Sequence, residues 1–177
     1  DSAIAKAGHV APDTTGWNFY EADQGLQDLL ALYLPEKLRA HLEPYLSQLG
    51  ELCAGRLDQA AHLADRHPPV LHHRDRFGND EQWIEYHPAY RELGQAAFGD
   101  FGIHALSHRG DVVGWPDPLP VVAKHAFTYL FNQTEFGLGC PINVTDSGAH
   151  CVRLFGDAAL KERFLDKMLS QDLGELW

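Results

Sequence analysis

Histidine is the side chain that most invites a chemical role here, because 11 of the 177 residues are histidine. His62 and His67, and the pair His72–His73 beside Asp75, are of residue types that bind transition metals. Their spacings match neither the i, i+4 pair of a helical zinc site nor a Cys/His finger. We therefore expect no metal site and interpret these histidines as surface residues beside a β-ribbon.

Two further motifs have the residue types of catalysis or of cofactor binding. His150 precedes Cys151, but a Cys–His dyad requires side chains that converge in space, and neighbours in sequence do not supply this. Gly137 and Gly139 lack the third glycine and the preceding strand of a dinucleotide-binding loop. We interpret the first pair as packing residues and the second as a helix break, and we predict no catalytic residue in this chain.

Glu135 is the carboxylate whose surroundings are most informative. It lies in an apolar stretch that we expect to be helical, close to Phe131 and next to Phe136. A carboxylate in such a stretch faces either a polar cavity or the edge of the domain, because burying it unpaired is costly. The sequence favours the edge, where the side chain meets solvent or another subunit, and leaves the cavity as the alternative.

Composition narrows the class of protein. The chain carries 14 Lys and Arg against 25 Asp and Glu, a net charge of −11, which disfavours binding to nucleic acid. Its cysteines, Cys53, Cys140 and Cys151, are odd in number and widely spaced, which favours reduced thiols. We find no apolar run long enough to span a membrane and no signal peptide, so we expect a cytoplasmic location.

The periodicity of apolar residues predicts one all-α domain of about six helices. Residues 1–22 are expected to form an extended arm with aromatic anchors, and residues 23–177 the domain. A short two-stranded ribbon is expected near 70–86, leaning on the helices because a lone hairpin is marginal. The expected helices cover approximately 23–32, 36–65, 88–98, 120–136, 142–155 and 157–169.

Three of these helices and one loop carry sharper predictions. Apolar residues recur at steps of three and four over 36–65, which predicts one helix with a continuous buried stripe. Pro44 interrupts this helix and is the place where we expect it to bend. Segment 142–155 is small and apolar nearly all round, which predicts central burial. Segment 157–169 has one apolar face, which we expect to turn inward. Residues 99–120 are expected to form a long loop, parts of which pack.

The C-terminal third resembles a known family. Residues 155–170 look like a helix boundary of the acyl-CoA dehydrogenase superfamily, and residues 135–141 are similar to its AidB-like (alkylation-response) branch. Residues 18–23, 75–79 and 84–88 share that similarity, in the same order and at similar spacing. Asp166 departs from the pattern, since proline is usual at its position, as does the pair Gln171–Asp172.

The resemblance implies a fold, an activity and a cofactor. It identifies the chain as the N-terminal helical domain of an enzyme that dehydrogenates acyl-CoA thioesters between the α and β carbons, with FAD as the hydride acceptor. In this family a flavin-binding β domain and a C-terminal helical domain with the catalytic glutamate follow. We therefore expect a fragment that is itself inactive and binds no FAD.

The resemblance also assigns site residues and partners. The N-terminal domain in this family forms one wall of the acyl and flavin pocket, and the positions that match it are Glu135, Phe136, Gly139, Cys140, Asn143 and Val144. We expect an acyl-CoA substrate in the full-length enzyme and a homo-oligomer, with no membrane and no DNA bound through this domain. Exposed apolar surface is expected over 121–155. The alternative is a complete, non-enzymatic helical interaction module, which predicts a closed surface.

Overall fold

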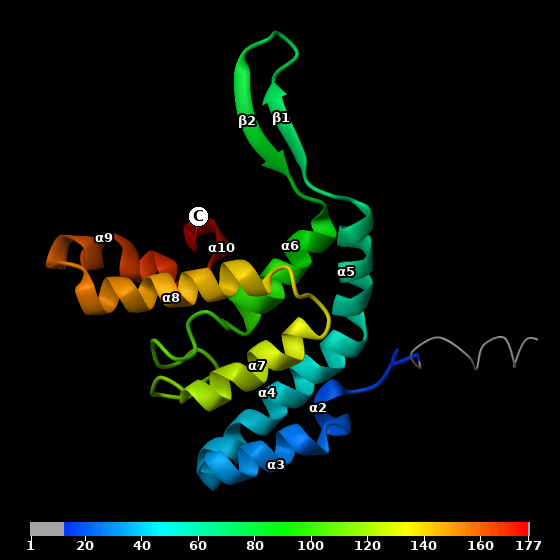
Figure 1. Ribbon diagram of the computed structural model, residues 1–177, viewed down its shortest axis with the longest axis vertical. Coiled ribbons are helices and arrows are strands. Elements are labelled where there is room, and N and C mark those ends of the chain that lie inside the picture. The colour runs from blue at the N-terminus through cyan, green and yellow to red at the C-terminus, as the bar shows by residue number, and fades with distance from the viewer. Residues whose placement is uncertain (1–12, 177) are drawn as a thin grey trace, which may run out of the picture.

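The computed structural model describes residues 13–176, and helices dominate this part of the chain (Figure 1). The all-α class and the two-stranded ribbon are confirmed, with more helices than expected because one predicted helix divides and one-turn helices appear near both ends. In chain order the elements are α2 (Phe19–Ala22), α3 (Gln24–Tyr33), α4 (Glu36–Ala54), α5 (Arg56–Arg66), β1 (Val70–Arg74), β2 (Asp80–Glu85), α6 (Pro88–Gly94), η1 (Gln95–Asp100), α7 (Val121–Asn132), α8 (Gly139–Phe155), α9 (Ala158–Met168) and α10 (Leu173–Leu176).

The predicted arm is helical at its end, which corrects the expectation of an extended segment up to residue 22. Asn18 caps α2 by accepting a hydrogen bond from the backbone N–H of Tyr20 at 3.0 Å, and its amide donates to the Ser47 carbonyl of α4 at 2.9 Å. A Cβ atom at Gly50 would lie only 2.6 Å from the Tyr20 backbone nitrogen, so glycine lets α2 rest on α4. Residues 1–12 of the predicted arm lie outside the described part.

The core forms where α4 packs against α7, α2 and α5, and where α5 packs against α6. Its largest fully buried side chains include Leu42, Leu46 and Leu49 of α4, Leu93 of α6, Phe98 of η1, and Phe127 and Phe131 of α7. The three leucines of α4 recur at steps of three and four residues, which is the stripe that the sequence predicts.

The continuous helix predicted over 36–65 is wrong, because Gly55 ends α4 and begins α5. Its φ of −131° and ψ of −97° are not helical. Pro44, where we expected the interruption, lies inside α4. Cys53 and Leu57 are both buried on either side of the break, so the apolar spacing passes through it unchanged and could not reveal it.

The long loop after η1 packs as predicted. Phe101, Ile103, Leu106 and Val112 are all buried, and the Leu119 N–H donates to the Leu106 carbonyl at 2.7 Å. The preceding helix runs further than expected, to Asp100, because α6 widens into the π-helix η1. The first loop residue, Phe101, closes this wide turn through a hydrogen bond from its N–H to the Ala96 carbonyl, five residues back, at 3.0 Å.

The hairpin stands away from the helices, which corrects the expectation that it leans on them. Figure 1 shows β1 and β2 projecting beyond α5 and α6, and every residue of β2 is exposed. The turn holds itself: an Asp75 carboxylate oxygen accepts from the backbone N–H groups of Phe77 and Asn79 at 2.8 and 2.9 Å. At the base, the His67 and His87 rings stack with centroids 4.5 Å apart.

Central burial of segment 142–155 is also wrong. Only Gly139, Ile142 and Ala149 of α8 are buried, and α9 buries no residue. The two helices pack on each other and lie beside the core (Figure 1), so each has one covered side and one open side. The predicted inner face of α9 is partly open, with Leu160 and Phe164 exposed, because none of the described elements covers it.

Candidate functional site

The residues predicted to form a pocket wall gather at the turn between α7 and α8 and on the first turns of α8. Glu135 lies in the turn and not in a helix, since α7 ends at Asn132. The Glu135 carboxylate accepts a hydrogen bond from the Leu138 backbone N–H at 3.1 Å and is half-buried. Through this bond the carboxylate shapes the turn.

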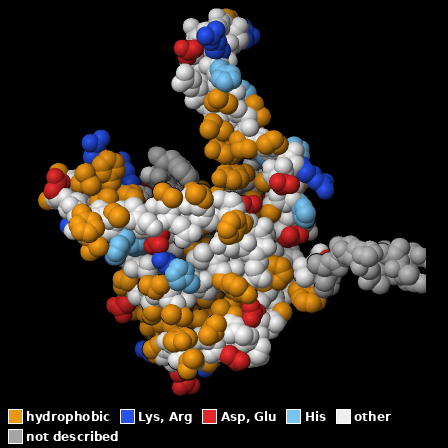
Figure 2. Space-filling view, in the orientation of Figure 1, with side chains coloured by type: hydrophobic (Ala, Val, Ile, Leu, Met, Phe, Trp, Pro, Cys, Tyr) orange, Lys and Arg blue, Asp and Glu red, His pale blue; other side chains and the backbone are white. Residues whose placement is uncertain are grey.

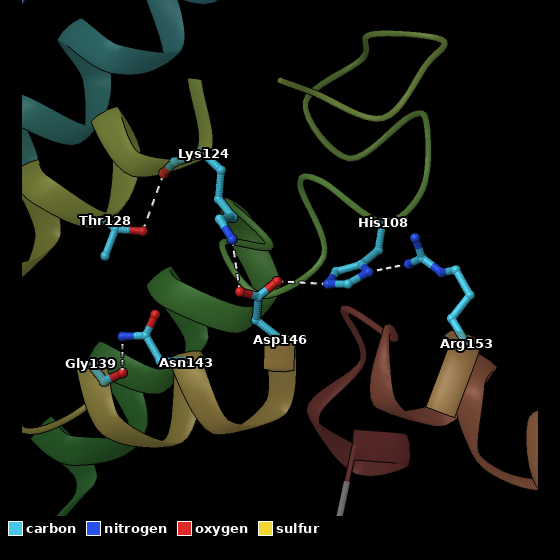
Figure 3. Close-up of polar contacts among 7 residues, drawn as sticks. All are labelled: His108, Lys124, Thr128, Gly139, Asn143, Asp146 and Arg153. Carbon is cyan, nitrogen blue, oxygen red and sulfur yellow. Dashed lines mark hydrogen bonds and ion pairs between the residues drawn. The ribbon is translucent and has the colours of Figure 1, made fainter. Parts of the chain in front are cut away.

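Gly139 and Asn143 are used to build the start of α8. A Cβ atom at Gly139 would lie 2.9 Å from the Asn132 amide oxygen, so glycine lets α8 begin close to the end of α7. The Asn143 amide donates to the Gly139 carbonyl at 2.7 Å (Figure 3). Both predicted wall residues therefore help to fix the backbone at the start of α8.

The other three predicted wall residues form an open surface. Phe136 is 78% exposed, Val144 is 65% exposed, and the Cys140 thiol is free and exposed. Cys140 and Val144 are four residues apart on α8, so they share a face. Together these residues make an apolar surface whose backbone is held by Glu135, Gly139 and Asn143.

A cavity of about 540 Å³, which was not predicted from the sequence, lies next to this turn. Leu138 of the turn forms part of its wall, with α6, η1 and α10 on the other sides. The Tyr86 and Tyr90 rings stack there at 4.8 Å, and burial raises the pKa of Tyr90, so that its hydroxyl remains protonated. The one available signal was the i, i+4 spacing of the two tyrosines. The cavity residues are Tyr86, Tyr90, Arg91, Gly94, Gln95, Phe98, Leu138, Leu173 and Gly174.

A second arrangement, also missed from the sequence, is a buried polar cluster that joins α7, the loop and α8 (Figure 3). Lys124 Nζ donates to one Asp146 carboxylate oxygen at 2.7 Å, and His108 Nε2 bonds the other at 2.6 Å. Arg153 contacts the remaining ring nitrogen, His108 Nδ1. The side chain of His108 is only 2% exposed, and those of Lys124 and Asp146 are 11% and 15% exposed.

The protonation states follow from these contacts. Burial lowers the pKa of His108, and the positive charges of Arg153 and Lys124 lower it further, so the ring is neutral. Its Nε2–H then donates to Asp146, and Nδ1 accepts from Arg153. Burial opposes the charge of Asp146, but hydrogen bonds from Lys124 and His108 outweigh it and hold the pKa of Asp146 below its ordinary value.

The cluster is a non-covalent link between elements and not a reactive centre. It contains no hydroxyl or thiol nucleophile, and its one carboxylate is occupied on both oxygens. It ties α8 to the core where apolar contacts are few. Lys124 and Asp146 each stand in an apolar helical stretch, which was the signal in the sequence that a buried pair exists.

Over residues 13–176, no group of three or more His, Cys, Asp or Glu side chains is arranged to hold a metal ion. His72 pairs with Glu85 at 2.7 Å and stacks on Trp83.

His150 and Cys151 are exposed on α8, so their interpretation as packing residues is wrong. Cys53 is buried, and burial raises the pKa of its thiol to about 12. No helix of this described part is long and apolar enough to cross a membrane.

Comparison with solved structures places this fold. The chain superimposes on the structure described as "Bd2924 apo-form" with a TM-score of 0.80 and 26% sequence identity, covering 93% of this chain and 32% of that one. It therefore spans about a third of that relative's length. A search of curated proteins found no match. The arrangement is that of an N-terminal helical domain of the acyl-CoA dehydrogenase superfamily.

The family is defined by the sequence itself. Residues 10–174 match the family described as adaptive response protein AidB N-terminal domain. The match covers most of the chain, and the chain belongs to this family. The predicted resemblance to the AidB-like branch is thereby confirmed.

Proposed function

We propose that this chain is the N-terminal domain of a longer, FAD-dependent acyl-CoA dehydrogenase-like oxidoreductase, and that it forms one wall of the pocket for the acyl chain and the flavin. The observation that carries the proposal is the open apolar surface at the start of α8, where Phe136 and Val144 are exposed on a backbone held firmly by its own hydrogen bonds. Such a surface is suited to contact with another part of the protein or with an apolar ligand.

The residues present fit a wall and not a catalytic centre. The open surface offers aromatic and aliphatic groups, and the nearby Glu135 carboxylate is already engaged by the Leu138 N–H. An apolar wall excludes water from a hydrocarbon chain and sets the space available to it. FAD, when bound, supplies the hydride acceptor. The groups of this chain position and enclose.

On this proposal the substrate is an acyl-CoA and the full-length protein is a homo-oligomer. The flavin-binding β domain and a second helical domain follow in the longer polypeptide. DNA is not bound through this domain, because its net charge of −11 repels phosphate. The alternative, a complete non-enzymatic interaction module, calls for a closed surface, and the exposure of Phe136, Val144 and Phe155 disfavours it.

The test uses the full-length protein encoded by the same reading frame. We expect it to purify with flavin absorbance and to lose that absorbance when acyl-CoA is added without air. In Val144→Phe the added ring narrows the pocket, and we expect kcat/KM for the longest accepted acyl chains to fall about tenfold relative to short ones. Measurement across a series of acyl-chain lengths gives this ratio.

A matched pair of phenylalanines controls for general effects. Phe136 and Phe77 are 78% and 74% exposed, but Phe77 lies in the hairpin turn, away from α8. Phe136→Ala is expected to change the acyl-chain preference, and Phe77→Ala to leave it unchanged. A full-length protein that binds no flavin, or a Val144→Phe variant with an unaltered chain-length profile, would contradict the proposal.

A further inference from the structure

We propose that a second concave site, formed by the loop after η1, the C-terminal half of α8 and the end of α9, binds the phosphate group of a small molecule. The concavity measures about 510 Å³, and its polar walls are His108, Arg109, Arg153, Asp166, Ser170 and Gln171. It is distinct from the apolar surface at the start of α8, and the proposal does not rest on the pocket-wall function.

Two guanidinium groups converge there from different elements. Arg109 belongs to the loop and Arg153 to α8, 44 positions later in the sequence. Of the described residues that line the concavity, Asp166 is the one carboxylate, so its fixed charges favour an anion. This balance is opposite to that of the whole chain, whose net charge is −11.

Neither arginine has a carboxylate partner in the described part of the chain. Arg109 Nε donates to the Leu169 carbonyl at 3.1 Å and its Nη2 to the Gln171 side-chain oxygen at 2.8 Å. Arg153 donates to the neutral ring of His108. Both residues are half-buried, and arginine that is withdrawn from water is normally paired with an anion. The missing partner is what an incoming phosphate would supply.

The contacts already made hold the two groups in place. Gln171, which accepts from Arg109, itself donates to the Gly99 carbonyl at 2.6 Å, so the Arg109 side chain is fixed to the core through two links. His108, which holds Arg153, is fixed by Asp146. A guanidinium has five N–H donors in a planar fork, so each arginine keeps donors for a ligand after these bonds.

The buried cluster keeps Asp146 from neutralising the site. Lys124 pairs with one oxygen of Asp146 from the core side, at 2.7 Å, and His108 occupies the other. Because Lys124 neutralises the charge of Asp146, the charge of Arg153, on the other side of His108, remains available to a ligand. The contacts from Lys124 through Asp146 to His108 thus hold the Arg153 guanidinium at the surface.

The fork geometry and the charge favour a phosphate. The size of the concavity accommodates a small phosphate ester. A nucleic-acid backbone is disfavoured, because the rest of the chain is strongly acidic.

The test follows the arginine Nε resonances of the isotopically labelled 177-residue chain by NMR during titration with inorganic phosphate. We expect the Arg109 and Arg153 signals to shift and to saturate in the millimolar range, while the signal of Arg163, exposed on α9, stays in place. Glycerol 3-phosphate is the second probe, and tighter binding of this ester than of free phosphate would identify an organic phosphate as the ligand class.

Variants test which residues bind the phosphate. Arg109→Gln and Arg153→Gln each remove a charge-assisted donor and should weaken phosphate binding about tenfold. Arg163→Gln removes the same charge outside the concavity and should leave binding unchanged. Asp166→Asn removes the opposing carboxylate and should tighten binding about two- to fivefold.

Three outcomes would overturn the proposal. They are the absence of shifts at Arg109 and Arg153 with millimolar phosphate, shifts of equal size at Arg163, and equal weakening by Arg163→Gln and Arg153→Gln. The wild-type titration and the Asp166→Asn variant keep the question answerable if either arginine variant proves unstable.

Discussion

Two regions of the molecule are stabilised differently: the interior around α4 and α7, and the pair formed by α8 and α9. In the interior, large apolar side chains such as Leu42, Phe98 and Phe127 are fully buried against one another. In the α8–α9 pair, large apolar side chains such as Val144, Phe155 and Phe164 are exposed, and α9 buries no residue. Figure 2 shows hydrophobic side chains at the surface over the hairpin and over the α3–α7 side as well.

The two regions differ in how much of their apolar surface is covered within the described part of the chain. Burial of apolar area stabilises the interior, and this stabilisation does not depend on the orientation of individual groups. The α8–α9 pair is attached through fewer apolar side chains, among them Ile142 and Ala149, together with directed bonds. These bonds run from Lys124 and His108 to Asp146, and from Arg109 to the Leu169 carbonyl. Its outer apolar side is exposed, with Val144, Phe155 and Phe164 among the open side chains.

The largest expected effect compares two phenylalanines, one from each region. Phe127 of α7 is fully buried and Phe155 of α8 is 83% exposed. Phe127→Ala should lower the free energy of unfolding by about 4 kcal/mol, because it leaves a cavity, whereas Phe155→Ala should change it by less than about 0.5 kcal/mol. Urea unfolding of both variants measures the difference, and similar losses would remove the contrast between the regions.

The next effect concerns acid sensitivity at the contact between the loop and the end of α9. His104 is fully buried, its Nε2 donates to the Ser170 carbonyl at 3.0 Å, and burial lowers its pKa from 6.5 to about 4. The unfolded chain binds the proton more readily, so the stabilisation is complete above pH 6.5 and is lost as the pH falls towards 4. The loss should be about 3 kcal/mol.

Unfolding free energies between pH 7 and 4 test this in wild type and in His104→Gln, which keeps a donor for Ser170 and removes the titration. The variant should show a flatter pH dependence. His73→Gln, at an exposed position on β1, is the matched control and should follow wild type. A slope in His104→Gln as steep as that of wild type would assign the acid sensitivity elsewhere.

The smallest effect compares two ion pairs. Lys124→Met leaves Asp146 with one partner in a largely buried setting and should lower the free energy of unfolding by about 2 kcal/mol. Arg56→Met breaks the pair with Glu92, whose side chains are 61% and 38% exposed, and should cost less than about 1 kcal/mol. Thermal unfolding at low salt compares them, and equal effects would mean that the buried cluster is no stronger an anchor than a surface pair.

Much of the fold follows from periodicity, and its exceptions have physical causes. The stripes of α4 and α7 and the turn at Asp75 are recorded directly in residue spacing and type. The break at Gly55 is not, because a glycine between buried residues four apart leaves the pattern unchanged. The exposure of α8 is not either, since apolar residues have the same types and spacing whether or not another element covers them.

The candidate site was predictable only where family likeness assigned it. The six wall residues came from that likeness, and they do gather at one turn, with Gly139 and Asn143 serving the backbone and Phe136 and Val144 facing outward. The cluster of His108, Lys124, Asp146 and Arg153 joins residues up to 45 positions apart. Such pairings depend on how the loop crosses α8, which spacing along the chain does not encode.

The π-helical turn η1 carries a consequence for insertions and deletions. Each residue in an α-helix advances the direction of the next side chain by about 100°. A π-helix closes each hydrogen bond one residue later than an α-helix, so it takes up an extra residue within a turn. Removing a single residue between Gln95 and Asp100 would let this segment rewind as ordinary α-helix, and Phe101 and Ile103 would still enter the interior from nearly the same direction. The same deletion within α4 would instead rotate every later residue of that helix away from its place in the core.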